Sequence, residues 1–276
     1  MLAAAGFSSF MLLAARADDQ VDRGRYLVTS IVACGNCHTQ KGPDGKPTGP
    51  ELAGGSPIVS PVFNAVPSNI TPDPETGIGK WTDAQIIDAI RNGRRPDGTL
   101  IGPPMAIEFY RDISDTDVKA IVAYLRQIKP VSNKTGKSVY KIPLPASYGP
   151  TVTSVPDTPR TDKVAYGHYL ATALGHCMDC HTPMVRGRND MSRVGAGGNK
   201  YGAPGGGVIT SSNLTPANAA GVAKWTDAQV KTAITKGVRP DGGAIVPMMA
   251  FAWYKDISTD DQDALVAYIR SLKPAQ

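Results

Sequence analysis

The chain has 276 residues, 41% of them hydrophobic and 19% charged, with a formal net charge of +5. This length allows two domains of ordinary size, each able to bury a core. The modest positive charge does not indicate a nucleic-acid partner.

The N-terminus resembles a secretory signal. Residues 1–14 are apolar, and Ala15-Arg16-Ala17 before Asp18 is an A-x-A cleavage pattern. We therefore expect a signal peptide over residues 1–17 and a mature protein in the bacterial periplasm. An uncleaved anchor is disfavoured, because the apolar stretch is shorter than a membrane-spanning helix, and no later segment is apolar enough to span a membrane.

Two Cys-x-x-Cys-His motifs use every cysteine of the chain. They are Cys34-Gly-Asn-Cys37-His38 and Cys177-Met-Asp-Cys180-His181. On one helical turn both thiols share a face and can add to the vinyl groups of one porphyrin, while the following His reaches the iron. The pattern predicts two covalently bound haem c groups. Zinc modules place their cysteine pairs closer together, and a redox or disulfide pair would not require the His twice.

Helices are predicted after each haem motif. Thr82 with Gln85 forms a capping box after Trp81, and Ser114 with Asp117 repeats that pattern before a last helix. The last helix should pack on the helix that enters the haem motif. Its predicted apolar face consists of Val118, Ile121, Val122, Leu125 and Ile128.

Met105 is predicted to be the second axial ligand of the first iron. After signal cleavage, residues 18–130 contain one His, His38, and one Met, Met105. A buried methionine is more often a core residue than a ligand, but no other candidate is present in this half.

A proline-rich linker is expected over residues 131–160, between one domain at 18–130 and another at 161–276. Its prolines fix φ and remove amide donors, which should exclude regular structure.

The second half repeats the first at a shift of 143 residues near the haem motif and 144 further on. The repeat aligns Met105 with Met249, and not with Met248, so Met249 is the predicted ligand beside His181. Two other histidines are interpreted as surface or helix-end residues. They are His168, which aligns with Arg25, and His176, which precedes Cys177. Matching segments are Asn69-Ile70-Thr71-Pro72 with Asn213-Leu214-Thr215-Pro216, Lys80–Gln85 with Lys224–Gln229, and Arg95-Pro96-Asp97-Gly98 with Arg239-Pro240-Asp241-Gly242.

These elements predict an all-α protein with two tandem domains. With its haem motifs and distal methionines, the chain resembles the class I cytochrome c family. In particular it resembles diheme cytochromes c and the cytochrome subunits of bacterial periplasmic alcohol, aldehyde, gluconate and molybdenum dehydrogenases. The resemblance implies that a proline carbonyl holds the proximal His, with Pro50, Pro43 and Pro47 as candidates. Trp81 and Trp225 are either propionate donors or core residues.

His/Met coordination raises the reduction potential of a haem and leaves no site for a substrate on the iron. We therefore predict an electron carrier and not an enzyme. The resemblance implies a periplasmic dehydrogenase as donor and another cytochrome or a terminal oxidase as acceptor, with membrane association only through a partner. Residues 18–130 carry 12 basic and 14 acidic side chains and residues 160–276 carry 13 and 9, so the halves could dock different partners. The alternatives are a subunit of a dehydrogenase complex, a diheme peroxidase and a thiosulfate-oxidising enzyme.

Overall fold

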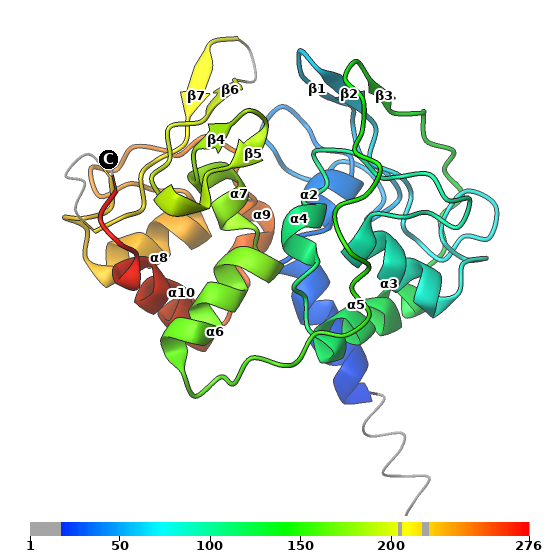
Figure 1. Ribbon diagram of the computed structural model, residues 1–276, viewed down its shortest axis with the longest axis horizontal. Coiled ribbons are helices and arrows are strands. Elements are labelled where there is room, and N and C mark those ends of the chain that lie inside the picture. The colour runs from blue at the N-terminus through cyan, green and yellow to red at the C-terminus, as the bar shows by residue number, and fades with distance from the viewer. Residues whose placement is uncertain (1–17, 204–205, 217–220, 276) are drawn as a thin grey trace, which may run out of the picture.

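The protein consists of two halves of similar build that lie side by side (Figure 1). The computed structural model describes residues 18–203, 206–216 and 221–275, and the expected signal peptide over residues 1–17 lies outside these ranges. The first half contains a helix over residues 18–29, α2 (Gly35–His38), α3 (Asp83–Asn92), α4 (Ile107–Tyr110) and α5 (Asp115–Gln127). The second contains α6 (Lys163–Tyr169), the π-helical turn η1 (Leu170–Leu174), α7 (Cys177–His181), the short 3-10 helix η2 (Met191–Arg193), α8 (Asp227–Lys236), α9 (Phe251–Tyr254) and α10 (Thr259–Ser271).

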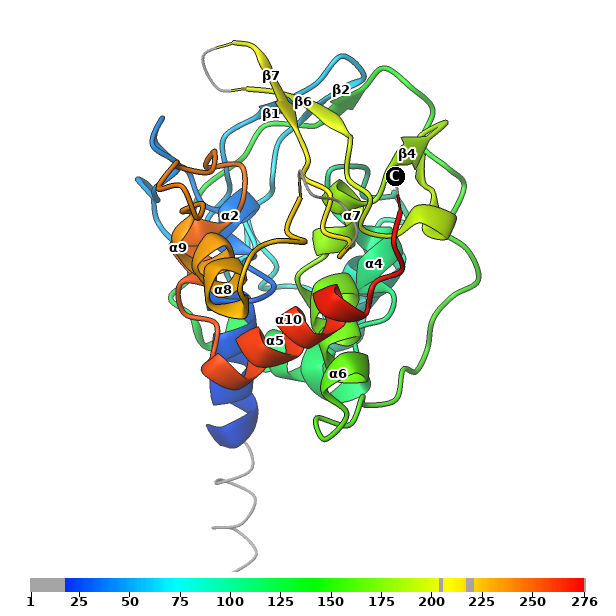
Figure 2. The same cartoon turned by 90° about the vertical axis from the view of Figure 1, so that its left-hand side faces the viewer.

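In each half the first and last helices cross at a glycine. A Cβ on Gly24 would lie 1.9 Å from the carbonyl oxygen of Ala120 in α5, and one on Gly167 would lie 1.9 Å from that of Ala264 in α10. Only glycine allows the backbones to approach this closely. Figure 2 shows α10 lying across α6. The predicted packing of the last helix on the helix entering the motif is confirmed.

The predicted caps are confirmed for the middle helices and only in part for the last ones. Thr82 and Gln85 form a full capping box at α3, as do Thr226 and Gln229 at α8. Ser114 accepts from the Asp117 amide at the start of α5, but the Asp117 carboxylate binds Arg23 instead of returning to the cap. The Asp117 side chain is one methylene shorter than a glutamate, and its carboxylate turns away from the start of α5 to bind the Arg23 cation.

The all-α prediction is confirmed only in part, because the described residues also contain short strands. The order β1-β2-β3 joins β1 (Ile58–Val59), β2 (Phe63–Ala65) and β3 (Val139–Tyr140) in one antiparallel sheet. Two hairpins in the second half pair β4 (Met184–Val185) with β5 (Arg188–Asn189) and β6 (Lys200–Gly202) with β7 (Val208–Thr210). Strand β3 belongs to the segment between the halves, so the prediction that this segment lacks regular structure was wrong at Val139 and Tyr140.

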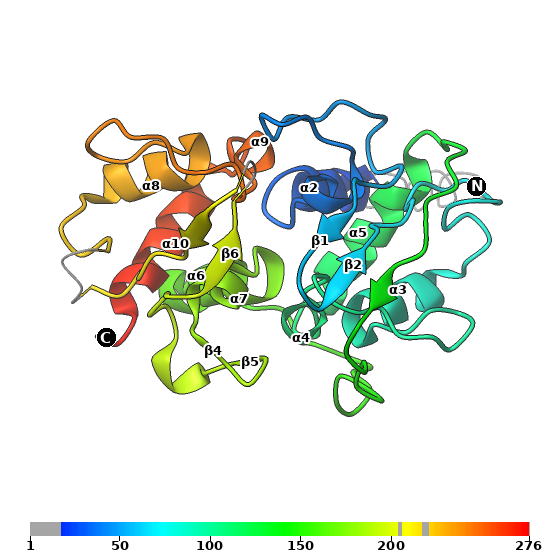
Figure 3. The ribbon, with the colours of Figure 1, turned by 90° about the horizontal axis from the view of Figure 1, so that it is seen from above.

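The two halves share one hydrophobic core. Leu27, Val28 and Tyr110 of the first half belong to the same buried cluster as Leu170 and Trp253 of the second. Figure 3 shows the boundary, where α9 faces α2 and the η1–α7 segment faces α4. Burial of apolar surface between the halves therefore joins them into one unit.

Paired tyrosines reinforce this boundary with an approximate twofold arrangement. Tyr26 donates to the Asp261 carboxylate at 2.7 Å, and Tyr169, its counterpart in the repeat, donates to the Asp117 carboxylate at 2.8 Å. Each tyrosine of a first helix thus reaches the N-terminus of the last helix in the other half.

Within the described ranges, no helix combines the length and the apolar character needed to cross a membrane.

Candidate cofactor sites

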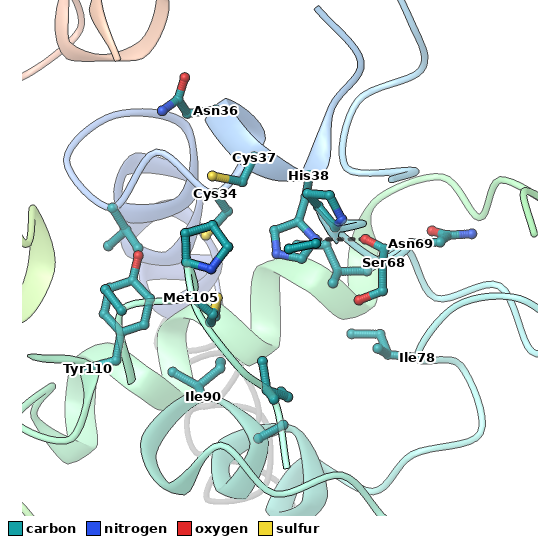
Figure 4. A pocket seen from close by; sticks show the side chains of 18 of the residues that line it. Cys34, Asn36, Cys37, His38, Ser68, Asn69, Ile78, Ile90, Met105 and Tyr110 are labelled. Atoms are coloured by element: carbon teal, nitrogen blue, oxygen red, sulfur yellow. Dashed lines mark hydrogen bonds between the residues drawn. The ribbon is translucent and has the colours of Figure 1, made fainter. Parts of the chain in front are cut away.

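The first Cys-x-x-Cys-His motif opens into a cavity with mainly apolar walls, called here the first cavity. Cys34, Cys37 and His38 lie at or on the short helix α2, and all three line the cavity together with Met105 (Figure 4). The structure therefore brings together the thiols, the imidazole and the thioether that the sequence singled out. No disulfide bond joins any of the four cysteines, all of which the structure describes.

Burial keeps these thiols and imidazoles neutral. It raises the pKa of Cys34 to about 12, and that of Cys177 to about 12 in the second motif. Burial also lowers the pKa of His38, although the backbone hydrogen bond of its ring opposes that effect. A neutral imidazole retains the lone pair that a metal ion requires.

One backbone carbonyl orients each motif histidine. His38 Nδ1 lies 2.7 Å from the Ser68 carbonyl oxygen, and His181 Nδ1 lies 2.8 Å from that of Ser212. Because a carbonyl only accepts, Nδ1 must donate, and Nε2 is left with its lone pair for a metal. Ser68 and Ser212 are counterparts in the repeat.

The expectation that a proline carbonyl holds the first histidine was wrong. The Pro50 carbonyl accepts instead from the Ala53 amide at 3.4 Å. Pro47 forms an isolated antiparallel β-bridge with Lys41. The described hydrogen bonds give Pro43 no role at the His38 ring either, since Ser68 is the partner of Nδ1.

The Asn-x-Thr-Pro segments fix the carbonyls that hold the histidines. The Asn69 side chain accepts from the Thr71 amide at 2.9 Å and donates to the Val131 carbonyl at 2.7 Å. In the second half, Asn213 accepts from the Thr215 amide at 2.7 Å and donates to the Ala275 carbonyl at 2.9 Å. Each asparagine closes a turn directly after the serine and ties it to the chain that follows the last helix.

The two candidate methionines occupy matching backbone turns. The Ile107 amide donates to the Met105 carbonyl at 2.8 Å, and the Phe251 amide donates to the Met249 carbonyl at 2.9 Å. Both side chains pack against the shared core, whereas Met248 is 38% exposed. Met249, and not Met248, is therefore the structural equivalent of Met105.

The tryptophans differ between the halves. Trp81 lines the first cavity, as expected for either of its two predicted roles. Trp225 packs against a small cluster that contains Val222 and Val230. In the second half Cys177, Cys180 and His181 lie on one helix, α7, and Met249 packs against the shared core.

Arg95 and Tyr140 are polar residues of the first cavity to which the sequence analysis assigned no role. Arg95 lies at its wall and donates to the Leu100 carbonyl at 2.7 Å, and Tyr140 reaches it from β3. The repeat of Arg95-Pro96-Asp97-Gly98 was a signal for the arginine. Tyr140 gave none, because it lies in a segment interpreted as a linker.

His176 is the N-cap residue of α7, so its interpretation as a helix-end residue is confirmed, but it is partly buried and not a surface residue. It lies in the second half, yet it lines the first cavity, as do Ala250 and Tyr254. Burial lowers the pKa of His176 to about 4. His168, by contrast, is exposed on α6 and meets the edge of the Tyr268 ring.

The donor set of the first cavity fits a covalently attached haem. It offers two thiols one helical turn apart, an imidazole with a free Nε2, a thioether, apolar walls and the cationic side chain of Arg95. Among the described residues, no group of three or more His, Cys, Asp or Glu side chains converges on a common point where a metal ion could bind.

Comparison with protein families assigns each half separately. Residues 19–125 match the family described as cytochrome C oxidase, cbb3-type, subunit III, and residues 164–273 match the family described as cytochrome c. The two matched regions correspond to the two halves of the structure.

Similar curated proteins include subunits of dehydrogenases. The chain is 33% identical to the cytochrome c subunit of alcohol dehydrogenase (quinone) from Gluconobacter oxydans (strain 621H), covering 99% of this chain and 59% of that protein. It is 31% identical to the gluconate 2-dehydrogenase cytochrome c subunit of Pantoea cypripedii, covering 94% of this chain and 62% of the relative. The chain thus spans about three fifths of the length of these two relatives. It is also 28% identical to a diheme cytochrome c-type protein of Cereibacter sphaeroides, covering 86% of this chain and 81% of that protein.

Proposed function

Because the chain belongs to the cytochrome c family, with one cytochrome c domain in each half, we propose that it is a diheme carrier of single electrons. It would accept electrons from a periplasmic dehydrogenase and deliver them to another cytochrome or a terminal oxidase. The observation that carries this proposal is the convergence of Cys34, Cys37, His38 and Met105 on one cavity.

Each half holds one haem c through its own motif. Cys34 and Cys37 would hold the first porphyrin and Cys177 and Cys180 the second, with His38 and Met105 as ligands of the first iron and His181 and Met249 as ligands of the second. The hydrogen bonds from His38 and His181 to serine carbonyls support this assignment, because they hold both rings in the tautomer that binds iron.

The bound haem supplies reversible one-electron chemistry at iron. The protein's own residues would hold the iron through His38 and Met105, exclude water with the apolar walls of the cavity and compensate charge there with Arg95. The matching backbone turns of Met105 and Met249 support a methionine ligand in both halves, which would leave no open position for a substrate. This disfavours a diheme peroxidase or a thiosulfate-oxidising enzyme.

The dehydrogenase partner is supported by the names of the relatives, which are cytochrome c subunits of alcohol and gluconate dehydrogenases. The same names favour a second arrangement, in which the chain is a fixed cytochrome subunit of such a complex. We place the protein in the periplasm, after removal of residues 1–17, with domains at 18–130 and 161–276 joined by residues 131–160. Co-purification of the tagged chain with a flavin, quinone or molybdenum protein would identify the fixed subunit.

Haem content tests the proposal. The alkaline pyridine spectrum of the purified protein should give two haems per chain, and both should remain with the polypeptide in acidified organic solvent. Replacing Cys34 and Cys37 by Ala should remove one haem, and replacing Cys177 and Cys180 should remove the other. Haem that is extracted by the solvent, or fewer than two haems per parent chain, would contradict the assignment.

A further inference from the structure

The second half contributes an aromatic side chain to the first cavity. His176, the residue before Cys177, meets the Tyr110 ring edge-on, with ring centroids 5.5 Å apart and an interplanar angle of 84°. Tyr110 and His176 both line the cavity that contains Cys34 and Met105. The first site is therefore completed across the boundary between the halves.

Tyr254 strengthens this boundary from the same side. It is the counterpart of Tyr110 in the repeat, lines the first cavity, and donates to the Gly175 carbonyl at 3.3 Å, one residue before His176.

His176 is a departure from the repeat. Its counterpart in the first half is Ala33, and both residues adopt a left-handed backbone, with φ of 39° and 51°. The backbone therefore accepts alanine at this position, and the imidazole is an addition that the second half alone makes. The left-handed backbone therefore does not explain why residue 176 is a histidine.

We propose that His176 is a residue of the first haem site and that its contact with Tyr110 is the route by which the two haem centres of one chain exchange electrons. This inference rests on the proposed function. In each transfer one iron goes from ferrous to ferric and the other from ferric to ferrous, with no bond made or broken and no proton required. The ring also closes the cavity wall against water.

Two substitutions form a matched pair. Each replaces a histidine of the second half by the residue found at the aligned position of the first half. His176→Ala introduces the counterpart Ala33, and His168→Arg introduces the counterpart Arg25. His168 is exposed and does not line the cavity. Haem content and the visible spectrum of the parent chain are measured first, so that a parent with fewer than two haems counts against the proposed function and not against this inference.

The deciding readout is the rate of electron redistribution between the haems after flash photoreduction, which is independent of protein concentration when it is intramolecular. His176→Ala should retain both haems, slow this step several-fold and lower the potential of the first haem through water entry. His168→Arg should match the parent. Equal rates in all three proteins would overturn the inference. If the alanine variant loses haem, His176→Leu, which fills the space without a ring, repeats the test with the same two outcomes.

Discussion

The motif histidines depend on partners that carry no residue signature. His38 and His181 are visible in the sequence, but the groups that orient them are main-chain carbonyls, which any residue type supplies. Only the repeat marks the position, because Ser68 and Ser212 directly precede the matching segments Asn69–Pro72 and Asn213–Pro216. The sequence could therefore predict the metal-binding side chains of the candidate site but not the hydrogen bonds that aim them.

Met105→His is expected to lower one of two midpoint potentials by on the order of 0.1 V, because imidazole stabilises the ferric state more than a thioether does. The other potential should stay nearly unchanged. A redox titration followed in the visible spectrum measures both values. Met191→His, at a side chain that is 57% exposed, is the control and should leave both potentials alone. An unaltered titration of the Met105 variant would remove Met105 from the ligand set.

Helix starts could be predicted well where they depend on hydrogen bonds between a side chain and the backbone a few residues away. The capping boxes at Thr82 and Thr226 are of this kind. The role of Gly24 and Gly167 could not, because a glycine within a helix gives no sign of the neighbouring backbone that requires it. Strand β3 was missed for a related reason, since two residues between prolines show no period and pair only through tertiary contacts.

Gly24→Ala gives a test in which helix propensity and packing predict opposite signs. Propensity alone would stabilise the helix by about 1 kcal/mol. The new Cβ, however, would lie 1.9 Å from the Ala120 oxygen, so we expect a net loss of about 1–3 kcal/mol in the free energy of unfolding. Gly136→Ala is the control, because its Cβ would meet nothing closer than Val66 at 3.7 Å. A more stable Gly24 variant in chemical denaturation would refute the close crossing.

Asp115 fastens the segment between the halves to the start of α5. Its carboxylate accepts from the Ser154 hydroxyl at 2.8 Å and the Val155 amide at 3.1 Å and pairs with Arg91 at 2.7 Å. These hydrogen bonds lower the pKa of Asp115 to about 2. Since the folded pKa lies below the unfolded value, the stabilisation is complete above about pH 4 and disappears as the pH falls through about 2.

Asp115→Asn should therefore be less stable than the parent at pH 6, and the difference should shrink as the pH falls from 4 to 2. Thermal unfolding at stepped pH values measures this difference. A gap between the two proteins that stays constant down to pH 2 would show that the charge of Asp115 does not contribute.

At the scale of the whole molecule, the shared core changes the picture of two separate domains on a linker. Helical periodicity showed that the last helices have apolar faces, but not that part of the apolar surface near Tyr110 and Trp253 is covered by the other half. Periodicity shows which face of a helix is buried, but not which part of the protein covers it.

The two halves have net charges of opposite sign, so different partners could dock at the two ends of the molecule. Reduction rates that do not change with ionic strength would argue against such docking.

Tyr26→Phe should destabilise the boundary more than Tyr169→Phe. Asp261 is 2% exposed, and the described part of the chain contains no salt bridge to its carboxylate, so the loss of its tyrosine donor should cost about 1–3 kcal/mol. Asp117 would still bind Arg23 at 2.8 and 2.9 Å, so the second substitution should cost only about 0.5–1.5 kcal/mol. Chemical denaturation of the two single variants compares them directly. Equal losses, or a larger loss for Tyr169→Phe, would contradict this asymmetry.

The most direct test of the account is exposure of the fully reduced protein to carbon monoxide. If both irons are closed by a histidine and a methionine, the visible spectrum of the two-haem protein should not change on the time scale of mixing. Rapid formation of a carbon monoxide complex at either haem would show an open coordination position, and would return the protein to the class of haem enzymes.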